Sequence, residues 1–446
     1  MTSGGLARDK SSSGQQSGSA GTQPRLVEAV DRPVSIAGAW TERLLRSKSD
    51  GDGEGRPLAN VHNALVAFQY APEWQEVLWF DESRQTIVAR CPPPWDVRGA
   101  PFDWTDEDDV RATAWLQKNE INVSKSITAD AVQTIAHENT FHPIRDYLDP
   151  LKWDGDPRLD DWLADYLGAE RTPYSRAVGP KFLIGAVARI YKPGCKMDNC
   201  LVLEGPQGAL KSTALRTLAG DEFFTDDVAV LGSKDSVMQV GGVWIAELAE
   251  LESIKGGHHN KQVKAFLSRK TDRIRLPYGR RVITLPRQSV FTGSVNNETW
   301  MSDETGGRRF WPVRIGKIDI EAIRRDRDQL WAEARSDYRS GVEWWLSPSE
   351  ESRLAEAEQT ARYRPGPWDD KIATYISKHW AESGPVNVTQ ILTECIGKDL
   401  KDQTQTDSNA VAKALQHHGW ERFRGSADPT TELRPWLYRP KPRLAR

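Results

Sequence analysis

The chain of 446 residues has little cysteine, no long apolar run and no secretory signal. Its four cysteines form no CxxC pair, and Cys195 and Cys200, although close together, have no second pair that would complete a zinc site. No apolar run approaches the length needed to cross a bilayer, and the N-terminus lacks the basic-then-apolar layout of a signal peptide. These absences exclude a disulfide scaffold and predict a protein of the reducing cytoplasm without a membrane partner.

The composition is that of a globular protein with local basic zones. Apolar residues make up 38%, charged residues 28%, and the net charge is -3. Residues 264–314 nevertheless hold eleven Lys and Arg against four Asp and Glu, and residues 421–446 hold seven against three. Such zones indicate a polyanion partner or, alternatively, solvated faces.

The length predicts several domains, and changes in texture along the chain divide it into four parts. Residues 1–56 are rich in Gly, Ser and Asp and poor in aromatics, which predicts a disordered tail. Residues 57–195 predict a mostly helical N-terminal region with a small β element. Residues 196–345 predict a nucleotide-binding core, and residues 346–446 predict a linker followed by three helices and a β-hairpin, which is a winged-helix pattern.

Three apolar runs define the predicted core. "NCLVLEG", "GVWIAEL" and "QSVFTGSVN" each have the texture of a buried parallel strand and each end in small or polar residues. Open α/β sheets bind their ligands at the carboxyl ends of the strands. The fold class predicted for this part is therefore α/β, with its site at that edge of the sheet.

The first run leads into "EGPQGALKST", which resembles the phosphate-binding pattern G-x-x-x-x-G-K-[ST]. Leu210 occupies the position of the second glycine. We expect Gly208 to supply positive φ, and Leu210 to lie at the helix start with ordinary right-handed dihedrals and its side chain directed away from the phosphates. The residues expected around ATP are Gly205, Pro206, Gln207, Gly208, Ala209, Leu210, Lys211, Ser212 and Thr213.

The second run, "GGVWIAELAELES", supplies carboxylates at the end of a strand. Magnesium prefers hard oxygen ligands, so Ser212 and Glu247 are the expected metal ligands. Glu247 is the first candidate to orient the attacking water, and Glu250 is the second, with orientation of Glu247 or helix capping as its alternative roles.

Polar and cationic residues follow in the order that a hydrolytic site requires. Asn296 and Asn297 end the third run, and Asn296 is the candidate to contact the γ-phosphate and the water, a turn-forming pair being the alternative. In "DETGGRRFWPV", Arg308 or Arg309 is the candidate arginine finger. A finger acting in trans requires an oligomer; the alternatives are an ion pair or a DNA contact.

Between the second and third runs, "DRIRLPYGRRVITL" predicts a β-hairpin with a basic, aromatic tip. A tip of this kind can hold a phosphate backbone and stack a base, and a solvated surface hairpin is the alternative. The candidate DNA-binding residues are Arg275, Tyr278, Arg280 and Arg281.

Six stretches give the chain a resemblance to the virulence-associated E family of phage, plasmid and genomic-island proteins. They are "HPIRDYLDPLKWDG", "VLEGPQGALKST", "WIAELAEL", "KAFLSRKTDRIRLPYGR", "LPRQSVFTGSVN" and "TGGRRFWPV", within residues 135–345. The family is similar to superfamily 3 helicases and to the helicase part of poxvirus-type primase-helicases. The resemblance therefore implies an AAA+-type core, a hexameric ring, ATP and Mg²⁺ as cofactors, and movement along DNA.

The predicted function is that of an ATP-dependent DNA helicase or replication ATPase of a mobile element. Lys211 would bind phosphates, and the C-terminal unit would dock origin DNA or a replication partner. Two other functions remain open: an origin-binding assembly protein that uses nucleotide without motor activity, and a signalling or defence ATPase.

Overall fold

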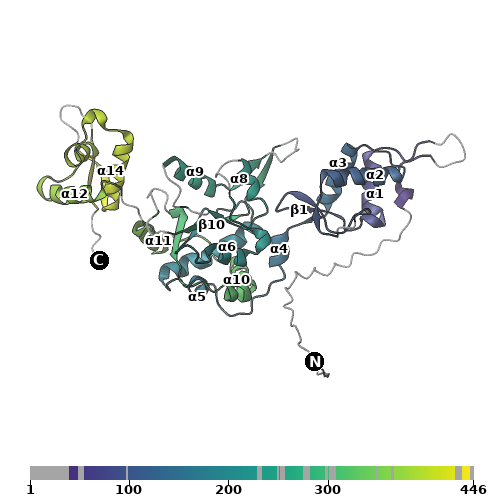
Figure 1. The fold of residues 1–446 in the computed structure, drawn as a ribbon, viewed down its shortest axis with the longest axis horizontal. Helices are drawn as coiled ribbons and strands as arrows, with labels where there is room; N and C mark the ends of the chain where they lie inside the picture. Colours follow the sequence, from purple (N-terminus) through teal and green to yellow (C-terminus); the bar gives the residue numbers. More distant parts are fainter. Residues whose placement is uncertain are drawn as a thin grey trace, which may run out of the picture.

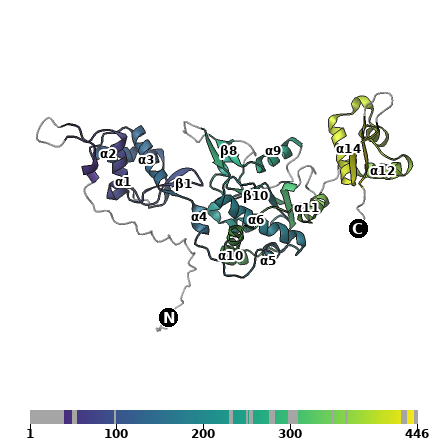
Figure 2. The same ribbon diagram turned by 180° about the vertical axis from the view of Figure 1, so that it is seen from behind.

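The computed structural model describes residues 40–48, 55–96, 99–228, 234–248, 251, 257–274, 282–296, 300, 308–347, 350–362, 366–426 and 434–441. They form three bodies that follow one another along the chain (Figure 1). Figure 2 shows the same row of bodies from behind, with the central one carrying the large sheet. Among the described residues, no helix is long and apolar enough to cross a membrane.

The N-terminal body packs helices against a small mixed sheet. Its helices are α1 (Val61–Tyr70), α2 (Asp106–Lys118) and α3 (Lys125–Glu138), with 3-10 turns η1 (Trp40–Arg43) and η2 (Pro72–Trp74). Its strands β1 (Leu78–Asp81), β2 (Thr86–Ala89), β3 (Phe102–Asp103) and β4 (Thr140–Phe141) have the order β3-β2-β1-β4. This sheet is the small β element of the region, and β1 and β2 are antiparallel neighbours in it.

Residues 40–48 belong to this body, although the sequence places them in the predicted tail. Leu44 is buried in the N-terminal core, and Trp40 stacks on Trp115 of α2. Asn63 of α1 fixes the segment, because its side chain exchanges hydrogen bonds with the backbone of Leu45 at 2.8 Å. The prediction missed this because one aromatic residue in a polar segment gives no local signal of the partner that buries it.

The central body is built on a five-stranded parallel sheet. Its strands are β5 (Cys200–Glu204), β6 (Phe224–Thr225), β7 (Ile245–Leu248), β10 (Val290–Val295) and β11 (Phe310–Arg314), in the order β11-β5-β10-β7-β6. The three apolar runs of the sequence are therefore neighbouring parallel strands, as predicted. A separate antiparallel pair is formed by β8 (Thr271–Ile274) and β9 (Ile283–Pro286).

Helices cover both faces of this sheet. They are α4 (Pro143–Leu148), α5 (Trp162–Leu167), α6 (Pro173–Tyr191), α7 (Lys211–Ala219), α8 (Lys234–Gln239), α9 (Gly257–Leu267), α10 (Ile320–Arg339) and α11 (Glu350–Ala361), with the turn η3 (Asp221–Phe223). Successive residues of β5 alternate between two cores: Leu201 faces the core of α5, α6, α7 and α10, and Val202 faces the core of α8 and α9.

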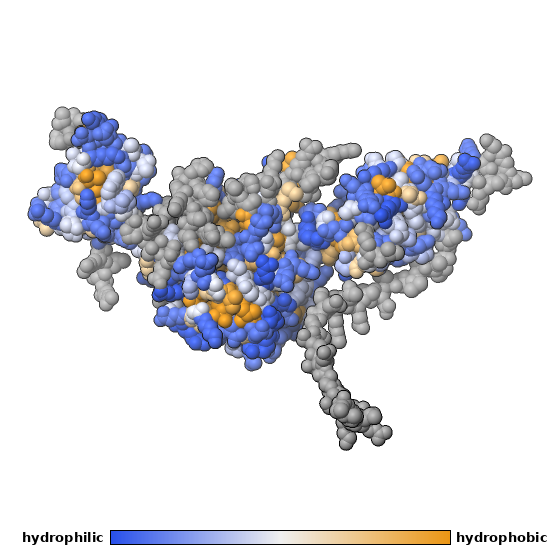
Figure 3. All heavy atoms as spheres, viewed as in Figure 1, coloured by the Kyte–Doolittle hydropathy of each residue, from blue (hydrophilic) through white to orange (hydrophobic). Residues whose placement is uncertain are grey.

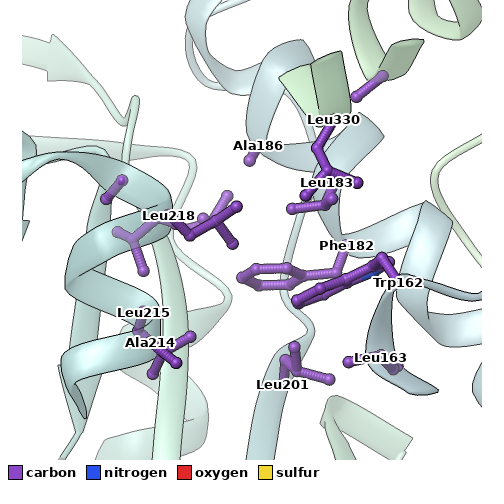
Figure 4. Packing of buried hydrophobic residues seen from close by; sticks show 14 of the residues in the cluster. Trp162, Leu163, Phe182, Leu183, Ala186, Leu201, Ala214, Leu215, Leu218 and Leu330 are labelled. Carbon is purple, nitrogen blue, oxygen red and sulfur yellow. The ribbon is translucent and has the colours of Figure 1, made fainter. Parts of the chain in front are cut away.

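Figure 4 shows the first of these cores from close by: Phe182 of α6 lies beside Trp162 of α5 and faces Leu218 of α7. The helices α4 to α6, which the sequence assigned to the N-terminal region, thus share a core with the sheet. Ala355 of α11 is buried in the same cluster. The central body consequently extends over about residues 143–362, so the predicted boundaries at 195 and 345 both fall inside it.

The C-terminal body has the predicted order of helices followed by a hairpin. It contains α12 (Asp369–Ser383), the short turn α13 (Val388–Gln390) continuing into the π-helical turn η6 (Ile391–Ile396), then η7 (Leu400–Asp402), α14 (Gln405–His417) and the antiparallel strands β12 (Trp420–Arg424) and β13 (Trp436–Pro440). A separate apolar core holds it together. In Figure 3, its visible face is hydrophilic around a small apolar patch, and the central body shows larger apolar patches.

Candidate functional site

The loop between β5 and α7, hereafter the phosphate loop, contains the residues that resemble the phosphate-binding pattern in the sequence. It follows the carboxyl end of a central strand and leads directly into the nine-residue helix α7. Gly205 N–H donates to the carbonyl of Val295 on the neighbouring β10 at 3.2 Å. Gly208 has φ of +81°, as predicted, and a Cβ built there meets nothing within 4 Å. A backbone with exposed N–H groups at a helix N-terminus favours an anion.

Leu210 departs from the prediction. It has φ of 62° and ψ of 24°, which is the left-handed region, and it is the N-cap residue of α7. The expectation of right-handed dihedrals is therefore wrong. The chain must reverse between Gly208 and Lys211 to enter the helix, and it does so at the position where the usual pattern has glycine. The Leu210 side chain is 51% exposed, so little packing offsets the strain of this backbone.

Lys211 lies at the first position of α7 and is folded back over the loop. Its Nζ donates to the carbonyl oxygens of Gly205 at 2.7 Å and Pro206 at 2.9 Å, and to Oδ1 of Asn296 at 3.1 Å. Asn296 follows β10, whose Val295 is in register with Glu204 of β5. The ammonium group and the candidate sensor amide are thus brought together by the pairing of two strands.

Ser212 and Glu247 meet beside the loop. Ser212 Oγ donates to Glu247 Oε1 at 3.0 Å, and Glu247 lies on β7, fully buried. Glu247 Oε2 is also buried and has no hydrogen-bond partner among the described residues. A hydroxyl and a carboxylate with an unsatisfied oxygen are hard donors that fit Mg²⁺. Glu250, the second acidic candidate, lies outside the described residues.

Arg308 and Arg309 lie at the amino end of the sheet's strands, whereas the phosphate loop lies at their carboxyl end. They precede β11, whose Phe310 pairs with Cys200 and whose Arg314 pairs with Glu204. The strand between these pairs separates the arginines from the phosphate loop of their own chain by roughly 15 Å. Neither arginine can therefore reach the phosphates of its own loop while β11 keeps this pairing with β5.

The two arginines differ in their surroundings. Arg309 Nε donates to Ser268 Oγ at 2.8 Å and lies 3.7 Å from Asp198, with the side chain 19% exposed. Arg308 is exposed, and its backbone carbonyl accepts from the Asn199 side chain at 3.2 Å. Arg309 is thus engaged in contacts within the chain, whereas Arg308 is exposed.

A cleft of about 830 Å³ opens beside Arg308. Its basic lining residues are Lys192, Lys196, Lys270, Arg308 and Arg309, and its acidic ones are Asp198 and Glu356. Asp198 pairs with Arg309, and no ion pair in the described part of the chain engages the three lysines or Arg308. This edge of the sheet therefore presents an excess of positive charge toward solvent.

One ion pair at the base of the phosphate loop has no counterpart in the sequence interpretation. Glu204, the last residue of β5, is 3% exposed, and both of its carboxylate oxygens lie 2.7 Å from Arg362 Nε. Trp300 Nε1 donates to the same carboxylate at 2.8 Å. Burial raises the pKa of Glu204, while Trp300 and Arg362 act in the opposite direction. Because 158 residues separate Glu204 from Arg362, no local motif signals this contact.

The structure describes the two strands of the predicted DNA-binding hairpin but none of its four candidate residues. The predicted hairpin is present in β8 and β9, but Arg275, Tyr278, Arg280 and Arg281 lie outside the described residues. In the C-terminal hairpin, Arg422 and Arg424 of β12 each lie 3.9 Å from the ring centre of Trp436 on β13. Trp436 is 41% exposed. This arrangement gives the hairpin a cationic, aromatic face.

Solved structures similar to this chain include three of the C-terminal region of NrS-1, each at 13% sequence identity and a TM-score of 0.43. The alignments cover 77% of this chain and 85% of that chain in one case, 81% and 95% in the second, and 81% and 96% in the third. No curated protein matches the chain significantly. The family model described as the virulence-associated protein E-like domain matches residues 148–363. The residues that this model matches coincide with the central body from the end of α4 to the end of α11.

Proposed function

We propose that the central body is a P-loop ATPase core of the AAA+ type, and that the chain is an ATP-dependent DNA helicase or replication ATPase of a mobile genetic element. One observation carries the proposal: Lys211 contacts Asn296, and Ser212 contacts Glu247, at the carboxyl ends of three adjacent parallel strands. The match to the virulence-associated protein E-like domain over this body supports it.

The loop residues bind the phosphates of ATP. Lys211 exchanges the carbonyls of Gly205 and Pro206 for phosphate oxygens, which are stronger acceptors because they are charged. The backbone N–H groups around Gly208 and the N-terminus of α7 add favourable dipoles. Asn296, whose Oδ1 accepts from Lys211, would contact the outermost phosphate through its amide.

Ser212 and Glu247 hold Mg²⁺, which would neutralise charge on the phosphates. Glu247 Oε2 is the available carboxylate oxygen, because Oε1 accepts from Ser212. Glu247 or Glu250 orients the attacking water and accepts its proton. The burial of Glu247 at the end of β7 fixes the carboxylate in place, so little reorganisation accompanies the reaction.

Arg308 completes the site of a neighbouring copy. Its distance from its own loop excludes action in cis, and its exposure leaves the guanidinium accessible from outside. The lysines of the adjacent cleft make the same edge attractive to a triphosphate. We therefore assign the arginine finger to Arg308 and a structural role to Arg309, within a homo-oligomer for which the hexamer is the expected form.

DNA binds at two places in this proposal. The hairpin of β8 and β9 binds the translocated DNA strand through Arg275, Tyr278, Arg280 and Arg281. ATP hydrolysis drives the movement of this hairpin along the DNA. The C-terminal body acts as a winged helix, with the Arg422, Arg424 and Trp436 face of its hairpin on origin DNA.

Subunit mixing tests the composite site. Lys211→Ala inactivates a loop but keeps Arg308, whereas Arg308→Ala keeps the loop but removes the finger. Each variant alone is expected to lack ATP turnover, and the mixture is expected to regain it. If the mixture stays inactive although native mass spectrometry shows mixed oligomers, the trans assignment is wrong.

Unwinding separates a motor from an assembly protein. The wild-type chain is expected to unwind forked DNA with ATP and Mg²⁺, while Lys211→Ala is not. ATP-dependent assembly on DNA without strand separation would instead support the origin-binding alternative.

A further inference from the structure

Helix α11 contacts the central sheet at two places, one beside the phosphate loop and one beside Arg308 and Arg309. Near its C-terminal end, Arg362 binds Glu204, the residue directly before Gly205 of the phosphate loop. One helical turn earlier, Gln359 Nε2 donates to the carbonyl of Phe310 at 2.9 Å. Phe310 is the first residue of β11 and lies two positions after Arg308. Helix α11 and Arg362, the residue that follows it, thus join the loop to the strand next to the candidate finger.

The contact at the loop end is strong. Arg362 is 12% exposed on its side chain and Glu204 is 4% exposed. The guanidinium also donates to the carbonyl of Glu358 at 2.8 Å and forms an ion pair with the Glu358 carboxylate. Since a buried charge that loses its partner carries a large penalty, the Glu204 carboxylate and Arg362 are expected to move together.

The loop end is also mechanically connected to Lys211. The Gly205 carbonyl, adjacent to Glu204, accepts from Lys211 Nζ, and a Cβ at Gly205 would lie 2.8 Å from Ile315. Little free space surrounds this residue. A rearrangement of Lys211 on phosphate binding therefore acts on a tightly packed backbone whose next side chain is held by α11.

The rest of α11 is fixed to the same body. It packs against α6 and β11, Ala355 lies in the core, and Lys181 of α6 lies 3.3 Å from Glu351. Ser352, Glu356 and Gln359 line the cleft beside Arg308. A helix held along its length transmits a displacement at one end to the other more effectively than a loop does.

We propose that Arg362 is a positioning residue that couples the phosphate loop of one protomer, through α11, to the Arg308 edge that the same protomer offers to its neighbour. This inference rests on the proposed ATPase function. It predicts that occupancy of one site changes the finger presented to the next site, so that neighbouring sites influence one another.

Mixed oligomers isolate the second half of this path, in which the Glu204–Arg362 pair and α11 hold the Arg308 edge in place. In a chain that carries Lys211→Ala, the loop is already inactive, and only its Arg308 edge contributes to the neighbouring Arg308→Ala subunit. Arg362→Lys is added to the Lys211→Ala chain, because lysine keeps the charge but loses the planar fork. We expect the restored ATP turnover to fall about fivefold to tenfold, in the usual range of coupling between sites.

Thr360→Ala in the same chain is the matched control. Thr360 is exposed on α11, and its hydroxyl bonds only within the helix, to the carbonyl of Glu356. It should leave the restored turnover unchanged. Glu204→Gln should lower the turnover as Arg362→Lys does, and the double variant should lose less than the two losses multiplied.

Two failures are distinguishable. If the unmodified mixture of Lys211→Ala and Arg308→Ala chains shows no turnover, the proposed trans site fails and the coupling fails with it. If that mixture is active and Arg362→Lys behaves like Thr360→Ala, the coupling alone is overturned. Binding of a fluorescent ADP derivative to the otherwise unmodified Arg362→Lys chain gives a readout without hydrolysis: we expect weakened binding, and unchanged affinity would contradict the positioning role.

Discussion

The left-handed backbone of Leu210 predicts that glycine at this position stabilises the protein. Left-handed dihedrals cost an L-residue about 1–2 kcal/mol, and Leu210 has φ of 62° with a side chain that is 51% exposed. Glycine removes that strain, but its greater freedom in the unfolded chain takes back about 0.4–1 kcal/mol. The centres of these two ranges, about 1.5 and about 0.7 kcal/mol, leave a net gain of about 0.8 kcal/mol.

The comparison is best made between Leu210→Gly and Leu210→Ala. Both variants lose the leucine side chain, but alanine keeps the strained dihedrals. For a body of this size, the net gain corresponds to a rise of about 1–4 °C in Tm. Differential scanning calorimetry of the full chain measures it, with the central transition assigned by its shift on adding ADP.

Gly208→Ala is expected to change Tm in the opposite direction to Leu210→Gly. Gly208 has φ of +81° and open space around an added Cβ, so the backbone strain acts alone and Tm falls. If Leu210→Gly is no more stable than Leu210→Ala, the Leu210 backbone is not strained and this reasoning is refuted. ADP affinity should be retained in Leu210→Gly, because the loop backbone keeps its shape.

Three further predictions concern other parts of the chain. Arg308→Ala should lower kcat about 1000-fold or more without lowering Tm, whereas Arg309→Ala should lower Tm by removing the contacts to Ser268 and Asp198; the reverse pattern in kcat and Tm would exchange their roles. Burial lowers the pKa of His142 from 6.5, so only the unfolded chain gains a proton as the pH falls below this value. Tm should consequently fall on acidification, and His142→Gln should reduce this fall. An equal dependence of Tm on pH in the wild-type chain and in His142→Gln would show that His142 is not the group responsible. Arg422→Ala should weaken DNA binding and reduce its log–log salt slope by about 1; an unchanged slope in a salt titration would show that Arg422 contacts no phosphate.

The sequence was sufficient to predict β5, β7 and β10 of the central sheet and the residues at their ends. Continuous apolar runs followed by small or polar residues favour buried parallel strands. The parallel neighbours β5, β10 and β7 confirm this prediction. The contact of Ser212 with Glu247 follows from that arrangement. Local patterns worked here because each strand carries its own hydrophobic signal.

Contacts between distant segments could not be predicted. Arg309 differs from Arg308 in its contacts with Asp198 and Ser268, which are far from both arginines in sequence. The ion pair of Glu204 with Arg362 likewise joins two segments with no shared motif. The boundary at residue 195 was wrong because α6 gives no local sign that its apolar surface packs on β5.

The conformation of Leu210 illustrates a different limit. The dihedrals of a loop residue depend on where the chain must go next, and leucine itself strongly disfavours φ of 62°. The identity of residue 210 as leucine therefore favoured right-handed dihedrals, in contrast to the left-handed ones observed. The match to the glycine position of the phosphate-loop pattern was the only signal, and that signal was the correct one.

DNA-stimulated ATP hydrolysis tests the central claim most directly. The measurement compares turnover by the wild-type chain, Lys211→Ala and Glu247→Gln, each with Mg²⁺ and with or without single-stranded DNA. The account predicts that the wild-type chain hydrolyses ATP, that DNA accelerates the hydrolysis, and that either substitution lowers it about 100-fold or more. A wild-type chain that lacks turnover, ignores DNA or is matched by Glu247→Gln would contradict the account.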